Sequence, residues 1–455
     1  HPVVMTEYAH AMGNSPGALY DYWNEIYHTP YIAGGFVWEF KNHGFYRRNP
    51  NGSEDYLYGG DFGDINHFSN FTLDGYHFSD GTPKPAAEEL REALAPAWAE
   101  LRDGDVYIMN TNDFRNLDEW TLEWRVLEDM TLIRHGERPM DHVPPHAWIC
   151  FRDYLPVNAQ TPGAEYRLEI LLKKDGRVDA AKQLRLPVRV QPQAFVPQPF
   201  TYQVTQKEHG VRVTGNDFAL HIENGMIARY EKNGDIRIDR PMQVQLFRAP
   251  TDNDGIVGRY PRRITDWNGA LLDQMRYHCE TTRVEQLADR VRVSTSGKVL
   301  PLAKFVGFVS EIDYEIYSGG KVLVRWHGVP YGKMPECLPR IGMMFTLRKS
   351  YQSAVWYGRG VAESYIDRCL STPMGRYACS IEKMNTLYEV PQETGNHYET
   401  RFVCVQEQNG PGFSVVGCPH FEFSFHPFDL QTLTRARHRS ELTESNVNYL
   451  YIDYK

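Results

Sequence analysis

The pattern of apolar and polar residues in the first part of the chain changes between strand and helix. Residues 3–8 and 31–40 are short apolar runs, as is typical of buried strands. Between them, from Leu19 to Ile26, apolar residues recur three and four positions apart, which predicts a helix with one buried face. A strand, a helix and a second strand in close succession predict a βα repeat with parallel strands.

The residues around this helix carry start and stop signals. Asn14 and Ser15 are able to cap its first turn, and Pro16 suits its first position. Pro30 ends it. Residues 79–98 predict a turn followed by a second helix, whose outer face is charged.

From about residue 97 the helical pattern almost stops. Residues 121–130, 164–175 and 183–192 alternate apolar and polar side chains, as half-buried antiparallel strands do. Residues 97–193 therefore predict a small β-sandwich of the immunoglobulin-like kind. Three prolines in residues 191–200 mark a linker.

The region 201–455 again has the pattern of strands, and there are too many of them for one small sandwich. We predict a large assembly of two sheets here. A length of 455 residues also suggests about three domains. The fold class predicted from the pattern is therefore multidomain and mostly β, with a βα segment at residues 1–96.

Composition limits the classes of partner. The chain is 42% apolar and 24% charged, with a formal net charge of −9, and its Lys and Arg residues form no stripe. We therefore expect no nucleic-acid partner. No apolar run approaches the roughly 20 residues that cross a bilayer, so we expect no membrane partner. The seven cysteines lie far apart without a CxxC pair, which indicates reduced thiols and a cytoplasmic location.

Candidate chemistry lies where the two predicted parallel strands end. Functional groups collect at the carboxyl ends of such strands. Glu7 ends the first strand, Trp38 ends the second, and His10 follows one turn after Glu7. An acid, an aromatic surface and polar donors are what a sugar pocket needs. Taken singly, these residues also suit a strand cap, a core side chain and a helix start.

Several motifs carry a resemblance to a known family. They are EYAHAMGN (7–14), GGFVWEF (34–40), GGDFGD (59–64), LDGYHFSDGTPKPA (73–86), RAPTDND (248–254) and YGRGVAESYIDR (357–368). Together they resemble the large bacterial β-galactosidases of glycoside hydrolase family 2, from His1 to Lys455. The resemblance implies that residues 1–96 are the last two βα units of a TIM barrel. It also implies that residues 201–455 are a small-chain-type β-supersandwich, truncated at its C-terminus.

The resemblance implies retaining hydrolysis of terminal β-D-galactosides such as lactose. Glu7 matches the nucleophile, His10 a residue that contacts the galactosyl group, and Trp38 the aromatic floor under the sugar. Phe71, through its carbonyl, and Asp74, through its side chain, match a sodium site that also holds the galactose 6-hydroxyl. Some family members have Asn at the position of Asp74, which leaves the sodium dependence open.

Other parts of the family's site are expected outside this chain. The acid/base Glu and most magnesium ligands belong to earlier barrel strands, upstream of His1. We therefore expect a fragment whose partner is the missing N-terminal segment, and we expect the isolated chain to be inactive. The resemblance implies Mg²⁺ and Na⁺ as cofactors and a homo-oligomer at full length.

Two alternatives remain at this stage. The first is another family 2 activity on β-glucuronides or β-mannosides, although Asp74 would repel a glucuronide carboxylate. The second is a non-catalytic carbohydrate-binding fragment. His142, His146, His420 and His426 have no regular ligand spacing, so we expect ordinary surface or turn positions for them.

Overall fold

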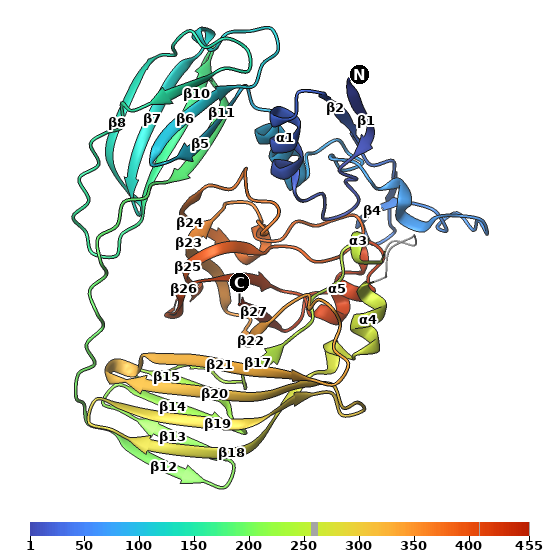
Figure 1. Cartoon of the computed structure of the whole chain (residues 1–455). Helices are drawn as coiled ribbons and strands as arrows, with labels where there is room; N and C mark the ends of the chain where they lie inside the picture. The colour runs from blue at the N-terminus through green and yellow to red at the C-terminus, as the bar shows by residue number, and fades with distance from the viewer. Residues whose placement is uncertain (256–262, 409, 455) are drawn as a thin grey trace. The chain divides into compact units, whose positions relative to one another are not determined.

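The computed structural model describes residues 1–255, 263–408 and 410–454 (Figure 1). The chain divides into two compact units. The first unit consists of His1–Arg47, Tyr56–Ala194 and Tyr357–Tyr377. The second unit consists of Arg48–Asp55, Phe195–Trp356 and Ala378–Lys455. The segment Tyr357–Tyr377 therefore belongs to the first unit, although the chain on both sides of it belongs to the second.

The βα pattern at the start of the chain is confirmed. Strands β1 (Val3–Tyr8) and β2 (Ile32–Val37) pair in parallel, with Tyr8 opposite Val37, and α1 (Leu19–His28) connects them. The helix starts later than predicted, because its N-cap position is Ala18 and no side chain caps it. The predicted capping by Asn14 or Ser15 is wrong, since both side chains bind other groups.

The rest of this βα segment is short and irregular. It contains the hairpin β3 (Phe45–Arg48) and β4 (Glu54–Leu57), the 3₁₀ turn η1 (Ser69–Thr72) and the predicted second helix, α2 (Pro85–Ala93). A small core joins α1, α2 and the end of β1, and it includes Tyr8, Leu19, Tyr76, Ala86 and Ala93. The helices thus cover one side of the two parallel strands.

The other surfaces of β1 and β2 are open. Val3 and Val4 are each 48% exposed, and Phe36 is 68% exposed. Parallel strands are usually buried on both faces, so apolar side chains exposed on such strands are unusual. Two βα units alone therefore leave apolar strand faces uncovered.

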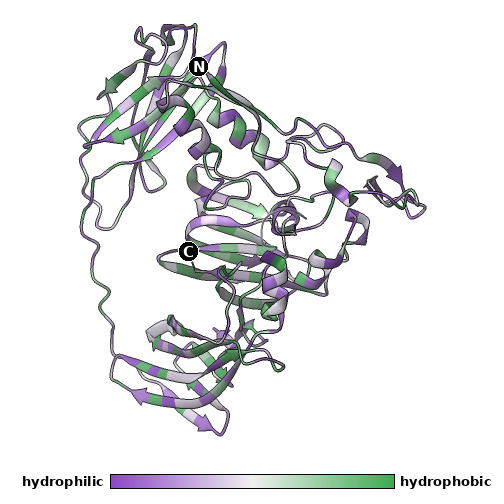
Figure 2. Cartoon of the chain, turned by 45° about the vertical axis from the view of Figure 1, so that its right-hand side comes forward, coloured by the Kyte–Doolittle hydropathy of each residue, from purple (hydrophilic) through white to green (hydrophobic). Residues whose placement is uncertain are grey.

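The predicted β-sandwich of the first unit is confirmed as two sheets around one core. One sheet has the order β5-β6-β9 and the other the order β11-β10-β7-β8. Along β7, Leu122, Trp124 and Val126 are buried, whereas Glu123 and Arg125 between them face outward. The strands are β5 (Ala97–Arg102), β6 (Asp105–Asn110), β7 (Thr121–Glu128), β8 (Thr131–Pro139), β9 (Trp148–Phe151), β10 (Tyr166–Lys174) and β11 (Arg177–Arg185), with the turn η2 (Leu117–Glu119). Figure 2 shows the resulting alternation of hydrophobic and hydrophilic residues along the strands.

Residues 186–202 connect β11 to β12 without a helix or strand, which confirms the linker predicted at 191–200. The strand predicted at 183–192 is wrong beyond Arg185, where β11 ends. The described residues beyond it form three sheets, not the predicted two. Their orders are β12-β13-β14-β15-β16, β18-β19-β20-β21 and β17-β22-β27-β26-β25-β23-β24. Sequence alternation predicts strands but not their partners. For example, β22 pairs with β27, about a hundred residues further along the chain. The domain limits at 96 and 193 stay a prediction.

The first two of these sheets are built from hairpins. Their strands are β12 (Gln203–Lys207), β13 (Gly210–Thr214), β14 (Phe218–Glu223), β15 (Met226–Lys232), β16 (Asp235–Ile238), β18 (Arg276–Gln286), β19 (Arg290–Leu300), β20 (Gly307–Tyr317) and β21 (Val322–Tyr331). The third sheet contains β17 (Gln243–Gln245), β22 (Gly342–Arg348), β23 (Tyr351–Arg359), β24 (Met374–Ser380), β25 (His397–Glu407), β26 (Gly412–His426) and β27 (Val447–Asp453).

Helices are short in this part of the chain. They are α3 (Asp252–Gly255), α4 (Arg263–Gly269), α5 (Leu430–Arg435) and the 3₁₀ turns η3 (Leu272–Gln274), η4 (Ser318–Gly320), η5 (Ile381–Lys383) and η6 (Arg439–Glu441). No helix in the described part of the chain has the length and hydropathy to span a membrane. The surface position predicted for His426 is wrong. Residues 422–426 end an interior strand whose two faces are both largely covered, and His426 is fully buried.

Candidate active site

The ends of β1 and β2 bring Glu7 and Trp38 to the same rim of the first unit. Trp38 N donates to Tyr8 O at 3.2 Å, and Ala11 N donates to Trp38 O at 2.8 Å, so the two strand ends are tied together. The Glu7 side chain is exposed, and it makes no hydrogen bond or ion pair with another described residue. Glu7 is therefore a carboxylate that is open to an incoming group.

Asp74 connects the aromatic and imidazole groups of this rim. Its Oδ2 accepts a hydrogen bond from Trp38 Nε1 at 2.9 Å, and His10 Nε2 lies 3.3 Å from the same oxygen. Burial alone would raise the pKa of Asp74, but its hydrogen bonds, that with His10 above all, lower the pKa. Asp74 is therefore held ionised and orients both rings. Sequence reasoning assigned these residues to one pocket but did not predict the bond between Trp38 and Asp74.

Glu39 is a further acid at this rim, and sequence reasoning missed it. Strand-like bonds place it beside Asp74: Glu39 N donates to Asp74 O at 2.9 Å, and Tyr76 N donates to Glu39 O at 2.8 Å. Burial and the neighbouring Asp74 carboxylate raise the pKa of Glu39. The signal available in the sequence was its position directly after Trp38.

One oxygen of Asp74 is left over. Asp74 Oδ1 is buried and has no hydrogen-bond partner among the described residues. A buried carboxylate oxygen without a partner suits a cation ligand. Phe71, the other residue assigned to sodium, lies near by, with its ring centroid 5.5 Å from that of His10. Within the described residues, no group of three or more His, Cys, Asp or Glu side chains is placed to hold a metal ion.

The loop that carries His10 has an unfavourable backbone at both ends. Ala9 has φ 53° and Ala18 has φ 59°, in the left-handed region that costs a residue with a Cβ on the order of 1 kcal/mol. Contacts from elsewhere in the unit support the loop. Tyr76 OH donates to Ala9 O at 3.2 Å, and the buried Lys84 Nζ donates to Ala11 O at 3.0 Å. Tertiary contacts therefore hold the conformation of this loop.

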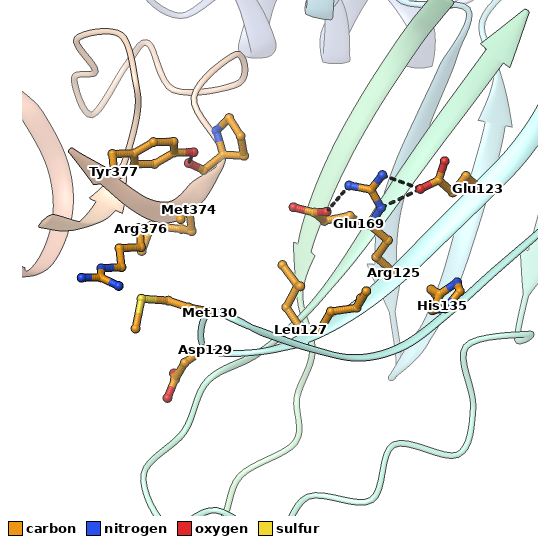
Figure 3. Close-up of a pocket in the computed structure, with 13 residues that line it drawn as sticks. Glu123, Arg125, Leu127, Asp129, Met130, His135, Glu169, Met374, Arg376 and Tyr377 are labelled. Atoms are coloured by element: carbon orange, nitrogen blue, oxygen red, sulfur yellow. Dashed lines mark hydrogen bonds and ion pairs between the residues drawn. The ribbon is translucent and has the colours of Figure 1, made fainter. Parts of the chain in front are cut away.

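A separate pocket of about 570 Å³ lies between the outer face of the sandwich sheet and residues 373–377 (Figure 3). In Figure 3, Arg125 lies between Glu123 and Glu169, with nitrogen–oxygen distances of 2.5 Å and 3.9 Å. None of the predicted site residues lines this pocket. Glu123 and Glu169, which flank Arg125 in this pocket, are ion-paired, unlike Glu7.

Three family models match the chain in order. "Glycosyl hydrolases family 2, TIM barrel domain" matches residues 1–97, "Beta-galactosidase, domain 4" matches residues 106–182, and "Beta galactosidase small chain" matches residues 214–455. The last of these covers more than half of the chain.

Curated relatives named "Beta-galactosidase" match along the whole chain. That of Actinobacillus pleuropneumoniae is 30% identical over 470 residues and that of Priestia megaterium 29% over 469 residues, each covering 100% of this chain. That of Vibrio cholerae is 29% identical and covers 99% of it. The chain spans 44% of the length of each of these relatives. A solved β-glucuronidase of glycoside hydrolase family 2 covers the whole chain at 10% identity with a TM-score of 0.17, too low to carry an argument.

The order of the three matched models is the order of the βα segment, the sandwich and the large β region in the structure. The relatives match this chain from end to end, and the motifs of the rim at Glu7 lie inside the TIM-barrel match. The chain therefore belongs to the β-galactosidases of glycoside hydrolase family 2.

Proposed function

We propose that this chain supplies the nucleophile side of a retaining β-galactosidase active site. The observation that carries the proposal is the parallel register of β1 and β2, in which Tyr8 lies opposite Val37. This register puts the open carboxylate of Glu7 and the indole of Trp38 at the same strand ends. Asp74 binds Trp38 and His10 at that rim.

In this proposal Glu7 attacks the anomeric carbon and forms a glycosyl ester. A second carboxylic acid protonates the leaving oxygen and then takes a proton from the attacking water. The two carboxyl groups of a retaining pair lie about 5–5.5 Å apart. Trp38 offers its ring to the apolar face of the sugar. The His10 imidazole, oriented by Asp74, is placed to contact a sugar hydroxyl.

We further propose that the acid/base Glu comes from a segment N-terminal to residue 1. The chain spans 44% of its relatives, and the uncovered apolar side chains of β1 and β2 offer a surface for further barrel strands. Covering that surface removes exposed Val and Phe side chains from water. The partners in this proposal are the missing segment, a β-galactoside substrate such as lactose and further copies of the complete enzyme, in the cytoplasm.

The sugar specificity in this proposal follows from charge. Asp74 stays ionised, because hydrogen bonds lower its pKa. An ionised carboxylate beside the pocket repels the carboxylate of a glucuronide and accepts a hydrogen bond from a neutral hydroxyl. A galactoside therefore suits the rim better than a glucuronide does.

A sodium ion also suits Asp74, whose buried Oδ1 has no partner among the described residues. Asp74 and the carbonyl of Phe71 would hold the ion, which would supply positive charge beside a sugar hydroxyl. Most of the magnesium ligands belong to the missing segment in this proposal.

The test uses Glu7→Gln in the enzyme formed by this chain and the missing segment. Because a neutral amide does not form the glycosyl ester, we expect turnover of an aryl β-galactoside to fall on the order of 10⁴-fold or more. Azide added to Glu7→Ala should restore turnover and give a galactosyl azide of inverted configuration, since the small anion attacks in place of the carboxylate.

The matched control is Glu25→Gln on α1, where an exposed Glu accepts a hydrogen bond from Thr29 at 2.7 Å. Its turnover should equal that of the wild type. Near-normal activity of Glu7→Gln would refute the role of Glu7. Enzyme-like turnover by the 455-residue chain alone would refute the proposal that the acid/base Glu comes from another segment.

A further inference from the structure

The side chain of Asn14 is bound at both ends by a segment far away in the sequence. Asn14 Nδ2 donates to Tyr365 OH at 2.9 Å, and Arg368 Nη2 donates to Asn14 Oδ1 at 2.6 Å. The partners are 351 and 354 residues away, and all three lie in the first unit. Asn14 belongs to the loop that follows β1 and carries His10. This contact therefore joins the segment Tyr357–Tyr377 to the candidate site.

Arg368 is itself held firmly. Its side chain is 4% exposed and lies 2.8 Å from an oxygen of Glu363, whose side chain is fully buried. Its guanidinium also lies over the Tyr365 ring, 5.0 Å from the centroid. Tyr365 and Arg368 exchange two backbone hydrogen bonds of 3.0 Å. The two side chains that hold Asn14 thus come from one tight turn and have little freedom to move.

The same segment also touches the far end of the loop. Ala18 N donates to Asp367 O at 2.6 Å. A Cβ placed on Gly17 would lie 2.0 Å from a carboxylate oxygen of Asp367, so the Asp367 side chain packs closely against this glycine. The loop is therefore fixed to the segment at two places, Asn14 and Ala18.

The segment is in turn attached to the rest of the first unit. The buried Glu89 of α2 accepts hydrogen bonds of 2.9 Å from the amides of Cys369, Leu370 and Ser371 and from the Ser371 hydroxyl. Gln183 of β11 binds both backbone groups of Met374, at 2.9 Å and 3.0 Å. The segment thus connects α2 and the sandwich to the loop of residues 9–18, and these attachments hold the segment in place against that loop.

We propose that Arg368, together with Tyr365, is a positioning residue for the reaction. It holds Asn14 and, through it, the loop of residues 9–18 that follows Glu7 and carries His10. The left-handed backbone at Ala9 and Ala18 means that the loop needs such outside contacts to keep its conformation. This inference rests on the proposed function, because the catalytic effect of Arg368 is exerted through Glu7 and His10.

The test compares Arg368→Met and Tyr365→Phe with the wild type in the enzyme that contains the missing segment. A displacement of about 1 Å at reacting groups costs up to 10²-fold in rate. We expect kcat of Arg368→Met to fall about 10- to 100-fold with KM changed less than about threefold, because the interactions lost belong to the transition state. Tyr365→Phe removes only one oxygen and should show a smaller fall of the same kind.

Hydrogen exchange measured on the same variants gives a readout that does not depend on activity. The amides of residues 9–18 should exchange about tenfold faster or more in Arg368→Met, whereas those of β10 should not change. The control is Arg152→Met, which removes a guanidinium bonded to Asp105 at 3.0 Å on the surface of the same unit. It should leave kcat, KM and loop exchange unchanged.

The outcomes separate this inference from the function on which it rests. Unchanged loop exchange and kcat in Arg368→Met and Tyr365→Phe would overturn the positioning role, even where Glu7 is essential. Faster exchange throughout the unit, with kcat and KM changed together, would also overturn it, because it would indicate general destabilisation. A third outcome combines faster loop exchange in Arg368→Met with normal activity of Glu7→Gln. It would refute the proposed function but leave the role of Arg368 in fixing the loop intact.

Discussion

Glu7 and Glu89 both belong to the βα segment, yet their surroundings differ in almost every respect. Glu7 stands on the rim at the end of β1, exposed and without a hydrogen-bond partner among the described residues. Glu89 lies in α2, is 1% exposed and accepts four hydrogen bonds from residues 369–371. The same side chain thus occurs once with free oxygens and once with all its bonding capacity used.

The comparison distinguishes two uses of a carboxylate. Glu7 is available to an incoming group, whereas Glu89 stabilises the fold. A buried carboxylate is stable only where donors replace its lost water, and the donors at Glu89 are three backbone amides and one hydroxyl. A nucleophile needs an oxygen that faces the reacting atom and that no donor occupies. The Glu7 carboxylate has no donor among the described residues, whereas the Glu89 carboxylate is fully occupied by donors.

The largest effect should come from removing Glu89. Glu89→Leu leaves three backbone amides and one hydroxyl without their acceptor, so we expect the free energy of unfolding of the first unit to fall by about 3 kcal/mol or more. The urea dependence of hydrogen exchange in β10 measures this quantity for that unit. The control is Glu88→Leu on the same helix, because Glu88 is half exposed and Arg91 is its one ion-pair partner among the residues that the structure describes.

Glu88→Leu should change the unfolding free energy by less than about 0.5 kcal/mol. Equal effects of the two substitutions would contradict the distinction between a saturated and an open carboxylate. So would a stable first unit in Glu89→Leu.

A smaller effect is expected at His426 in the second unit, another fully buried titratable group. Burial, with help from the charge of Arg340, lowers the pKa of His426 to about 3. The unfolded chain takes up a proton below pH 6.5, whereas the folded chain does not do so until about pH 3, so stability falls as the pH drops through this window. The contribution should be about 2 kcal/mol at pH 5.

His426→Phe should remove this pH dependence. Between pH 7 and pH 5, the wild type should lose about 2 kcal/mol more unfolding free energy of the second unit than the variant does. Burial raises the pKa of Asp453 to about 7, which acts with the opposite sign in both proteins and cancels in the difference. His142→Phe, at an exposed histidine, should keep the wild-type dependence. If the unfolding free energies of the wild type and His426→Phe changed with pH in parallel, His426 would not be the source of the pH dependence.

The smallest effect on stability is expected at Glu7 itself. Because no described residue binds its side chain, Glu7→Gln should change the unfolding free energy of the first unit by no more than about 0.5 kcal/mol, in contrast to the loss of turnover expected from the proposed function. Exchange of the α1 amides measures this change. A loss of 2 kcal/mol or more would show that Glu7 supports the fold, as Glu89 does, and would remove the contrast between the two glutamates.

The sequence by itself determined those helices and strands whose apolar residues recur at a regular short spacing. The apolar runs around Val3 and Ile32 and the helical spacing after Leu19 predicted β1, β2 and α1, and alternation predicted β7 and β10 of the sandwich. The position of Glu7 and Trp38 at one rim followed as well, because parallel strands joined by a helix end on the same side. Family motifs added the roles proposed for His10, Phe71 and Asp74.

Tertiary structure alone decided which polar groups meet. The start of α1 was predicted wrongly because Asn14 was taken as its N-cap. In the structure, the Asn14 side chain instead accepts a hydrogen bond from Arg368, 354 residues away. The carboxylate of Glu89 looked like part of a solvated helix face, yet it is buried and bound by residues 369–371, about 280 positions away. Hydropathy periods report which face of a helix or strand is covered. They carry no information on which distant backbone groups cover it, because that depends on how the whole chain is routed.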